Sequence, residues 1–176
     1  MDNAKQELKS LMRSFPQGVT IITTRHGGEL YGITVSSFTS VSLSPPLILV
    51  SVSKEAPTHE VLLGEESFAV NILASDQASL SEKFAGRNTG STGKFHGTKY
   101  RIGKNGSPIL EPSLGFLECK RWGSFDGGDH TLILGEVTNG ESKKDDLPLV
   151  YYNRQYTTVL LPTLERSSYD SLLGEW

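Results

Sequence analysis

The residues most able to do chemistry form a run of hydroxyl side chains between Gly32 and Pro46. Ser and Thr at this density, in a chain that must turn, can donate hydrogen bonds to a phosphate while neighbouring backbone N–H groups point the same way. A solvent-exposed strand rich in Ser and Thr would have the same composition, so the residues alone leave both interpretations open. The hydroxyls belong to Thr34, Ser36, Ser37, Thr39, Ser40, Ser42 and Ser44.

Histidine and cysteine are too scattered along the chain to predict a metal site. The histidines are His26, His59, His96 and His130, and none lies four residues from another His or from Cys119. Because Cys119 is the single cysteine, an internal disulfide framework and a multi-cysteine metal site are both excluded. We therefore expect no bound metal.

Three common catalytic motifs are absent from the sequence. Neither G-x-G-x-x-G nor G-x-x-x-x-G-K-[ST] occurs, and residues 92–94 (Thr-Gly-Lys) are only a fragment of such a glycine-rich loop. A Ser-His-Asp hydrolase would draw on Asp129 and His130, but there is no G-x-S-x-G elbow. Adjacent Asp and His residues are also not expected to form the hydrogen bond that orients a catalytic histidine. Rossmann, P-loop and serine-hydrolase chemistry are thus disfavoured.

The composition is typical of one globular domain. A chain of 176 residues with 36% hydrophobic residues can bury a core without disulfides, so we expect a single domain over residues 1–176. The net charge of −3 lacks the basic excess of a nucleic-acid binder. Apolar runs such as residues 46–52 are shorter than the roughly 20 residues of a membrane helix, and the start of the chain lacks the apolar core of a signal peptide. We expect a cytoplasmic protein with no nucleic-acid or membrane partner.

Periodicity predicts how the first half of the chain is arranged. Leu8, Leu11, Met12 and Phe15 stand at helical spacing, so residues 4–15 are expected to form a helix. Short runs rich in β-branched and aliphatic residues predict strands, and two further segments with helical spacing predict short helices. The strands are expected at residues 19–24, 30–35, 47–52 and 68–73, and the helices at 58–65 and 75–86.

The second half of the chain is also expected to be mainly β. Residues 86–107, rich in Gly, Ser, Thr, Asn and Lys, predict a long exposed loop. Four further strands are expected at residues 116–122, 131–138, 147–152 and 156–161, followed by a helix over 167–176. That helix would carry an apolar stripe of Tyr169, Leu172, Leu173 and Trp176. Seven or eight short strands with peripheral helices favour a β-barrel.

Six motifs in a fixed order make the sequence recognisable. They are Phe-Pro-x-Gly-Val (15–19), Gly-x-Thr-Val-Ser-Ser-Phe-x-Ser-Val-Ser-x-x-Pro-Pro-Leu (32–47), Phe-x-Val-Asn-x-Leu (68–73), Leu-Ser-x-x-Phe-Ala (80–85), Leu-Glu-Cys (117–119) and Gly-Asp-His-Thr-x-x-x-Gly-Glu-Val (128–137). Over about residues 12–161 the chain resembles the short-chain flavin reductases of two-component monooxygenases. The resemblance implies a mainly β, Greek-key type split barrel, the FMN-binding split barrel, with peripheral helices.

The resemblance also implies which residues hold the flavin, FMN or FAD. The segment before the hydroxyl run would bind ribityl and phosphate oxygens, and the strand after Pro46 would present backbone groups to the isoalloxazine edge. A second segment would add a cation for the phosphate and an aromatic ring that either packs on the flavin or belongs to the core. The implied contacts are Thr34, Val35, Ser36, Ser37, Ser51, Val52, Ser53, Lys54, Thr58, Ser81, Phe84, Ala85 and Arg87.

For the hydride donor, NADH or NADPH, the resemblance points to His130 and an aromatic residue. His130 would position the nicotinamide with its C4 near the flavin N5, because orientation and electrostatic support are what the protein must supply for hydride transfer. Tyr152 would close the nicotinamide site, although the parity of the strand decides between it and Tyr151. Asp129 is expected to structure the turn, and Cys119 to be a small buried hydrophobe.

The implied activity is reduction of FMN or FAD by NAD(P)H, with release of reduced flavin to a separate monooxygenase. An FMN-binding electron carrier on the same barrel, reduced by a protein partner, is the alternative; a heme- or pyridoxal-phosphate-binding split barrel is disfavoured by Gly-Asp-His. The resemblance further implies a homodimer. The choice between NADH and NADPH stays open, since Lys94, Lys99 and Arg101 could either read a 2′-phosphate or keep the loop soluble.

Overall fold

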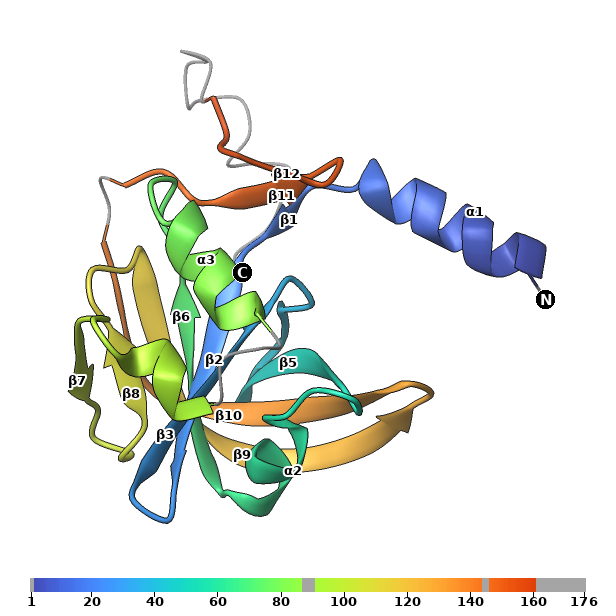
Figure 1. Ribbon diagram of the computed structural model, residues 1–176. Helices are drawn as coiled ribbons and strands as arrows, with labels where there is room; N and C mark the ends of the chain where they lie inside the picture. The colour runs from blue at the N-terminus through green and yellow to red at the C-terminus, as the bar shows by residue number, and fades with distance from the viewer. Residues whose placement is uncertain (1, 87–90, 144–145, 161–176) are drawn as a thin grey trace.

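The computed structural model describes residues 2–86, 91–143 and 146–160, and its main feature is one antiparallel sheet (Figure 1). The sheet has the strand order β3-β2-β6-β9-β10-β5-β4. It closes on itself into a barrel-like body, with the long β9–β10 hairpin extending from one side (Figure 1). Its strands are β2 (Thr20–His26), β3 (Glu29–Val35), β4 (Thr39–Leu43), β5 (Pro46–Ser53), β6 (Ser67–Ile72), β9 (Gly115–Gly127) and β10 (His130–Ser142).

Smaller elements surround this sheet. A three-stranded sheet consists of β1 (Gln17–Gly18), β11 (Val150–Tyr152) and β12 (Gln155–Thr157), and a separate pair consists of β7 (Tyr100–Ile102) and β8 (Pro108–Leu110). The helices of the described residues are α1 (Asp2–Arg13), α2 (His59–Gly64), α3 (Ala78–Ala85) and the short 3-10 helix η1 (Ser91–Phe95). None of the described helices is long and apolar enough to cross a membrane.

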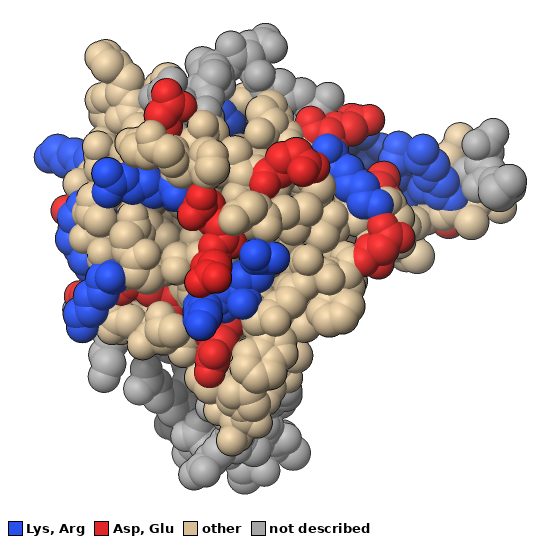
Figure 2. All heavy atoms as spheres, turned by 90° about the horizontal axis from the view of Figure 1, so that it is seen from below, with Lys and Arg blue, Asp and Glu red and all other residues tan. Residues whose placement is uncertain are grey.

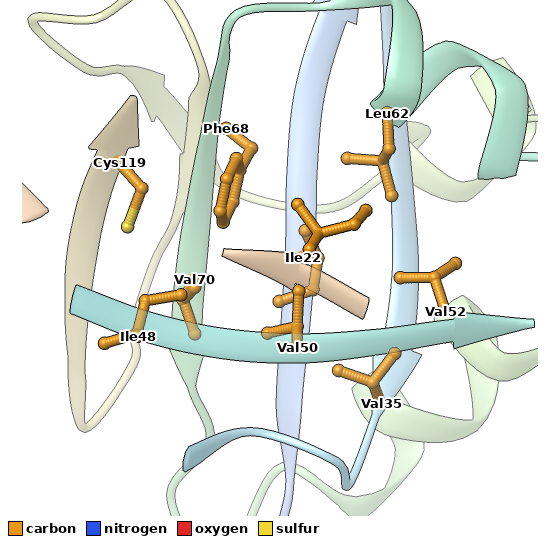
Figure 3. Packing of buried hydrophobic residues seen from close by; sticks show 10 residues of the cluster. Ile22, Val35, Ile48, Val50, Val52, Leu62, Phe68, Val70 and Cys119 are labelled. Carbon is orange, nitrogen blue, oxygen red and sulfur yellow. The ribbon is translucent and has the colours of Figure 1, made fainter. Parts of the chain in front are cut away.

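The core lies inside the sheet, where alternate residues of each strand point inward. In β5, Ile48, Val50 and Val52 are buried while the residues between them are only partly covered, which is the period-two pattern of a strand with one buried face. These side chains pack with Phe68 and Cys119 from the opposite strands (Figure 3). A second cluster, which includes Phe84, Phe95 and Leu149, fills the space between the sheet and α3.

The predicted mainly β architecture is confirmed. Of the two interpretations left open for the hydroxyl run, residues 39–43 follow the exposed strand, because they form the edge strand β4. One prediction about a particular segment is wrong. Residues 86–107 are not simply an exposed loop, because they contain η1 and β7, and Phe95 is buried with its ring edge-on to Phe84 at 5.1 Å. The helix expected over residues 167–176, with Tyr169, Leu172, Leu173 and Trp176, lies outside the described residues.

Helix α1 forms as predicted but does not lie on the body. It projects away from the barrel (Figure 1), and the apolar side chains that define its stripe remain exposed. Leu8 is 62% and Leu11 69% exposed, and Met12 and Phe15 are exposed as well. Within the described part of one chain, no surface covers this apolar stripe. An isolated helix of 12 residues is marginally stable in water, so α1 needs such a covering surface for its stability.

Candidate functional site

Several of the predicted flavin contacts meet around one cavity of about 180 Å³. The end of β3 contributes Thr34, the end of β5 contributes Ser53, and the turn before α2 contributes Thr58. The C-terminal end of α3 and the start of the following segment complete the wall. The full lining is Ile33, Thr34, Ser53, Ala56, Pro57, Thr58, Ala85, Gly86 and Lys94.

Two of the predicted hydroxyls connect the elements around this cavity. The Thr34 hydroxyl donates to the backbone oxygen of Ser81 at 2.7 Å, which ties β3 to α3. The Ser81 hydroxyl, itself buried, shares a 2.9 Å hydrogen bond with the hydroxyl of Tyr156 on β12. Tyr156 was not singled out from the sequence, because its contact depends on a residue 75 positions away. These hydroxyls therefore fix the cavity wall.

The Ser37 hydroxyl is used in the same way. It donates to the backbone oxygen of Ser51 at 2.8 Å and accepts from the Ser51 N–H at 2.9 Å. Strand β4 pairs with β5 only as far as Leu49, so beyond that point Ser37 takes the place of a neighbouring strand. Ser36 makes no side-chain hydrogen bond with a described residue, and it lines a different pocket, at the base of α1.

Three predicted contacts are core residues. Val35, Val52 and Phe84 are all buried in the hydrophobic clusters. A Cβ placed on Gly32 would lie 2.6 Å from the Phe84 ring, so the absence of a side chain at this position lets β3 approach α3 closely. Of the two roles considered for Phe84, its position supports the core role.

The structure places one cation in the cavity that the flavin contacts implied by the resemblance did not include. Lys94 is only 5% exposed, and its ammonium donates to the backbone oxygens of Phe84 at 2.8 Å and Gly32 at 3.4 Å. Burial lowers the pKa of this ammonium. An ammonium has three N–H donors, so one is left for the cavity. The sequence around Lys94 is rich in Gly and Thr and does not indicate that the lysine is buried. The neighbouring residue Phe95 packs against Phe84, and this contact between distant segments draws Lys94 into the interior.

The two other cations expected at the phosphate differ from Lys94. The Lys54 ammonium is hydrogen-bonded to the exposed carboxylate of Asp126 on β9, and this bond lowers the pKa of that carboxyl group. The ammonium of Lys54, which follows β5, is therefore paired with a carboxylate of β9, and Lys54 does not line the cavity. Arg87 lies outside the described residues.

His130 lies beside the cavity as the first residue of β10. It is paired in register with Ser53, and directly opposed residues of antiparallel strands have their Cβ atoms about 5 Å apart on one face. Its Nδ1 is 2.6 Å from Oδ1 of Asp129, which lowers the pKa of that carboxyl group. The expectation that neighbouring Asp and His residues would not form such a bond is wrong, because the turn between β9 and β10 brings both side chains to the same side.

A buried contact behind His130 holds the start of β10 in place. Nε2 of His59 is 2.8 Å from the hydroxyl of Thr131, the residue after His130, and both side chains are buried. The backbone of the preceding turn is also fixed, because the Lys54 N–H donates to the oxygen of Asp129 at 3.0 Å. His130 is thus presented from a rigid strand end, although its own side chain is 42% exposed.

The two candidate tyrosines of β11 lie on opposite sides of that strand. Tyr151 packs against Tyr156 with ring centroids 5.3 Å apart and lines the pocket at the base of α1. Tyr152 is exposed and lines none of the cavities described here. Within the described residues, His130 is therefore paired with a residue of the 180 Å³ cavity wall, Ser53, whereas Tyr152 does not line that cavity.

Two larger hollows hold none of the predicted site residues. One, of about 640 Å³, lies along the ends of β9 and β10, and a neighbouring one of about 340 Å³ lies beside β8. Within the described residues no three His, Cys, Asp or Glu side chains are grouped so that they could hold a metal ion.

Comparison with known proteins gives consistent matches over nearly the whole chain. Residues 12–160 match the sequence model of the family described as "Flavin reductase like domain". The chain is 34% identical over 153 residues to the reductase component of the FADH(2)-dependent resorcinol hydroxylase of Rhizobium sp. (strain MTP-10005), covering 86% of this chain and 85% of that protein. It is 38% identical over 133 residues to an NADH-dependent FAD reductase of Streptomyces globisporus, covering 74% and 72%.

A solved structure shows the same fold. The NADH:FAD oxidoreductase of Streptomyces globisporus C-1027, in complex with NAD and FAD fragments, superposes with a TM-score of 0.85 at 31% sequence identity. The match covers 94% of this chain and 98% of that one. The predicted split barrel is therefore confirmed.

Proposed function

The chain belongs to the flavin reductase like domain family, and from this premise we propose that it is an NAD(P)H-dependent flavin oxidoreductase. In this proposal it reduces FMN or FAD and supplies the reduced flavin to a separate monooxygenase. The observation that carries the proposal is the convergence of Thr34, Ser53, Thr58 and Lys94 on one cavity, with His130 on the adjacent strand. Hydride transfer from a reduced nicotinamide to a bound flavin is the chemistry that these cofactors supply.

The polar groups of the cavity fit a flavin. A flavin carries a phosphate and ring carbonyls, which need hydrogen-bond donors, and the cavity offers the ammonium of Lys94. The Ser53 hydroxyl accepts from the Glu55 N–H at 3.3 Å and so keeps its own hydrogen for a ligand. Burial makes the Lys94 cation a strong partner for negative charge, including the charge that reduction adds to the flavin. In this proposal the flavin is held by four polar residues of the cavity wall: Thr34, Ser53, Thr58 and Lys94.

His130 would position the nicotinamide. Asp129 engages Nδ1 of the imidazole, which fixes the ring and leaves Nε2 as the nitrogen able to face a ligand. Because hydride transfer depends on alignment of donor and acceptor, the work of this side chain is orientation rather than proton transfer. Tyr152 stays a candidate for closing this site, as do Ser36 and Arg87 for the flavin phosphate.

We further propose that the enzyme is a homodimer acting in the cytoplasm, with one domain over residues 1–176. A cavity of 180 Å³ is smaller than the roughly 300–1,000 Å³ typical of small-molecule sites, so one chain covers only part of a flavin. The uncovered apolar stripe of α1 supports a second copy as the missing surface. The cytoplasm is where reduced nicotinamide coenzymes are made and where the unpaired Cys119 stays a thiol.

The test is anaerobic oxidation of NADH and of NADPH by the purified protein, with FMN, FAD or riboflavin added. Without oxygen, a flavin reductase oxidises one equivalent of nicotinamide for each equivalent of flavin supplied. Once oxygen is admitted, it reoxidises the reduced flavin and the reaction turns over. Flavin binding without any nicotinamide oxidation would contradict the proposal and support the electron-carrier alternative. The ratio of the NADH and NADPH rates also decides the coenzyme preference.

A further inference from the structure

A second pocket, of about 330 Å³, opens where α1 leaves the body. It lies next to the end of β3, because Ser36 belongs to its wall while Thr34 belongs to the wall of the flavin cavity. Its lining consists of Lys9, Met12, Arg13, Gln17, Ser36, Tyr151, Asn153 and Arg154. Three of these residues are cations and none is an acid, in a protein whose net charge is −3.

Helix and hairpin are fixed relative to each other at this pocket. Lys9 and Arg13 stand four positions apart and so share one face of α1. The Asn153 N–H donates to the backbone oxygen of Arg13 at 2.9 Å, which joins the end of the helix to the turn between β11 and β12. In that turn Asn153 and Arg154 have φ angles of 47° and 63°, a left-handed backbone that residues other than glycine rarely adopt. The strained turn brings the Arg154 side chain to the pocket.

The three cations have no compensating charge within the described residues. Lys9, Arg13 and Arg154 form no ion pair and no side-chain hydrogen bond there, although other cations such as Lys54 and Arg101 are paired with carboxylates. On the face shown in Figure 2 both signs of charge are mixed, over the body and along the projecting helix α1. Three like charges around one hollow repel each other, so an anion between them would be stabilised by all three.

We infer that this pocket is a subsite for a phosphate of a dinucleotide, an inference that rests on the proposed function. Strand β3 ends at Val35, and Ser36 follows it, two residues after Thr34, so the two residues are at most about 7 Å apart along the chain. A ligand held in the flavin cavity can therefore place a further phosphate beside Lys9, Arg13 and Arg154. Arg and Lys side chains are the usual partners of phosphate oxygens. FMN, with one phosphate, cannot occupy both places, whereas FAD can; the pyrophosphate of NADH or NADPH is the second possible source.

The experiment compares two charge-matched double variants. Arg13→Gln with Arg154→Gln removes two cations of the pocket, and Arg25→Gln with Lys120→Gln removes two exposed cations whose side chains make no hydrogen bond within the described residues. Calorimetric titration measures the affinity for inorganic pyrophosphate, riboflavin, FMN, FAD, NADH and NADPH. We expect the pocket variant to bind pyrophosphate and one dinucleotide about three- to tenfold more weakly at low salt, since each exposed charge contributes modestly. The control variant should match the wild type.

The pattern of losses identifies the source of the phosphate. A fall in the FAD-to-riboflavin affinity ratio assigns the pocket to the flavin dinucleotide, and a selective loss for NADH and NADPH assigns it to the hydride donor. Unchanged affinities for pyrophosphate and for all three dinucleotides overturn the inference. Because these are binding measurements, they are separate from the proposed function, which fails only if no flavin supports NAD(P)H oxidation by the wild type.

Discussion

The imidazole of His130 has two nitrogens in different surroundings. Nδ1 lies 2.6 Å from the Asp129 carboxylate, while the ring is 42% exposed beside the flavin cavity. In the proposed function Asp129 acts through its contact with the imidazole, as a positioning residue. The hydrogen bond is present above the lowered pKa of the Asp129 carboxyl and is lost as the pH falls through that value, because a protonated carboxyl accepts a hydrogen bond more weakly than a carboxylate.

Replacement His130→Ala should slow hydride delivery without loosening flavin. If the ring orients the nicotinamide, we expect kcat/KM for NAD(P)H to fall about 10–100-fold, or about 1.4–2.7 kcal/mol, at nearly constant flavin affinity. Stopped-flow reduction of flavin-saturated protein measures this, because flavin occupancy is then fixed. The matched control is His26→Ala, which removes another exposed histidine with its Nδ1 2.6 Å from a carboxylate, far from the cavity.

Two other results would assign His130 differently. An unchanged reduction rate across a full NADH titration would remove it from the mechanism and direct attention to Tyr152. A lower melting temperature with an unchanged rate for the folded fraction would make it a structural residue.

Cys119 provides a second prediction for a single side chain. It is fully buried, and burial, with a smaller contribution from the charge of Glu118, raises the pKa of its thiol from 9.0 to about 12. Thiolate is the reactive form, so an aromatic disulfide reagent at pH 8 should label the folded protein far more slowly than the urea-unfolded protein. Above pH 9 the unfolded thiol loses its proton before the folded one, so stability should fall as the pH rises from 9 toward 12. Rapid labelling of the folded protein would contradict this burial.

At the scale of elements, Ser37 joins the segment between β3 and β4 to the end of β5, where β4 no longer pairs with β5. Ser37→Ala would leave both the N–H and the C=O of half-buried Ser51 without their partner, a loss of about 1–3 kcal/mol. We expect the melting temperature to fall by several degrees, at roughly 2–4 °C per kcal/mol for a chain of this size. Ser36→Ala, one residue away and without such a bond, is the control and should leave the melting temperature unchanged. The measurement is thermal unfolding of the flavin-free proteins. Equal losses of stability in the two variants would refute a structural role that belongs to Ser37 and not to Ser36.

How well the elements could be predicted depends on what determines them. Strands β2 and β5 are runs of β-branched and aliphatic residues, continuously buried over the first five residues of β2 and alternately buried in β5, so their local sequence was sufficient. The edge strand β4 stayed one of two open interpretations of the hydroxyl run, because exposed Ser and Thr residues suit a strand as well as a phosphate-binding turn. Segment η1 was missed because Phe95 is buried by an aromatic contact with Phe84 rather than by a local pattern.

The site shows the same division. Thr34, Ser53, Thr58 and Ala85 were predicted by resemblance and do meet at one cavity. Lys94 was open to a different interpretation, because a lysine in a Gly-rich segment is usually solvated and only the fold buries it. Which hydroxyls face a ligand and which join strands, as Ser37 does, also depends on contacts between distant segments.

At the scale of the whole molecule, helix α1 is the feature that one chain leaves unexplained. Leu8, Leu11 and Met12 form an exposed apolar stripe on a helix that projects from the barrel, and exposed Phe15 follows two residues after its end (Figure 1). Burying one such side chain stabilises an assembly by about 1.5–3 kcal/mol. The base of the same helix carries Lys9 and Arg13 of the cationic pocket, so anchoring α1 would also fix that pocket.

The last prediction is that this stripe binds a second copy of the chain. Wild-type protein at micromolar concentration should have twice the 19.2 kDa mass of one chain by light scattering. Leu8→Glu with Leu11→Glu should weaken the dimer by more than about 100-fold, because two buried leucines are replaced by charges that lose hydration at an apolar interface. Gln6→Glu with Ser10→Glu adds the same charge to the opposite face of α1 and should leave the dimer intact.

If the cavity of one chain encloses too little of a flavin, the monomeric variant should also bind flavin more weakly, while the control binds it normally. A wild-type monomer that binds flavin tightly would refute the homodimer, and a dimer insensitive to both variants would move the interface away from α1.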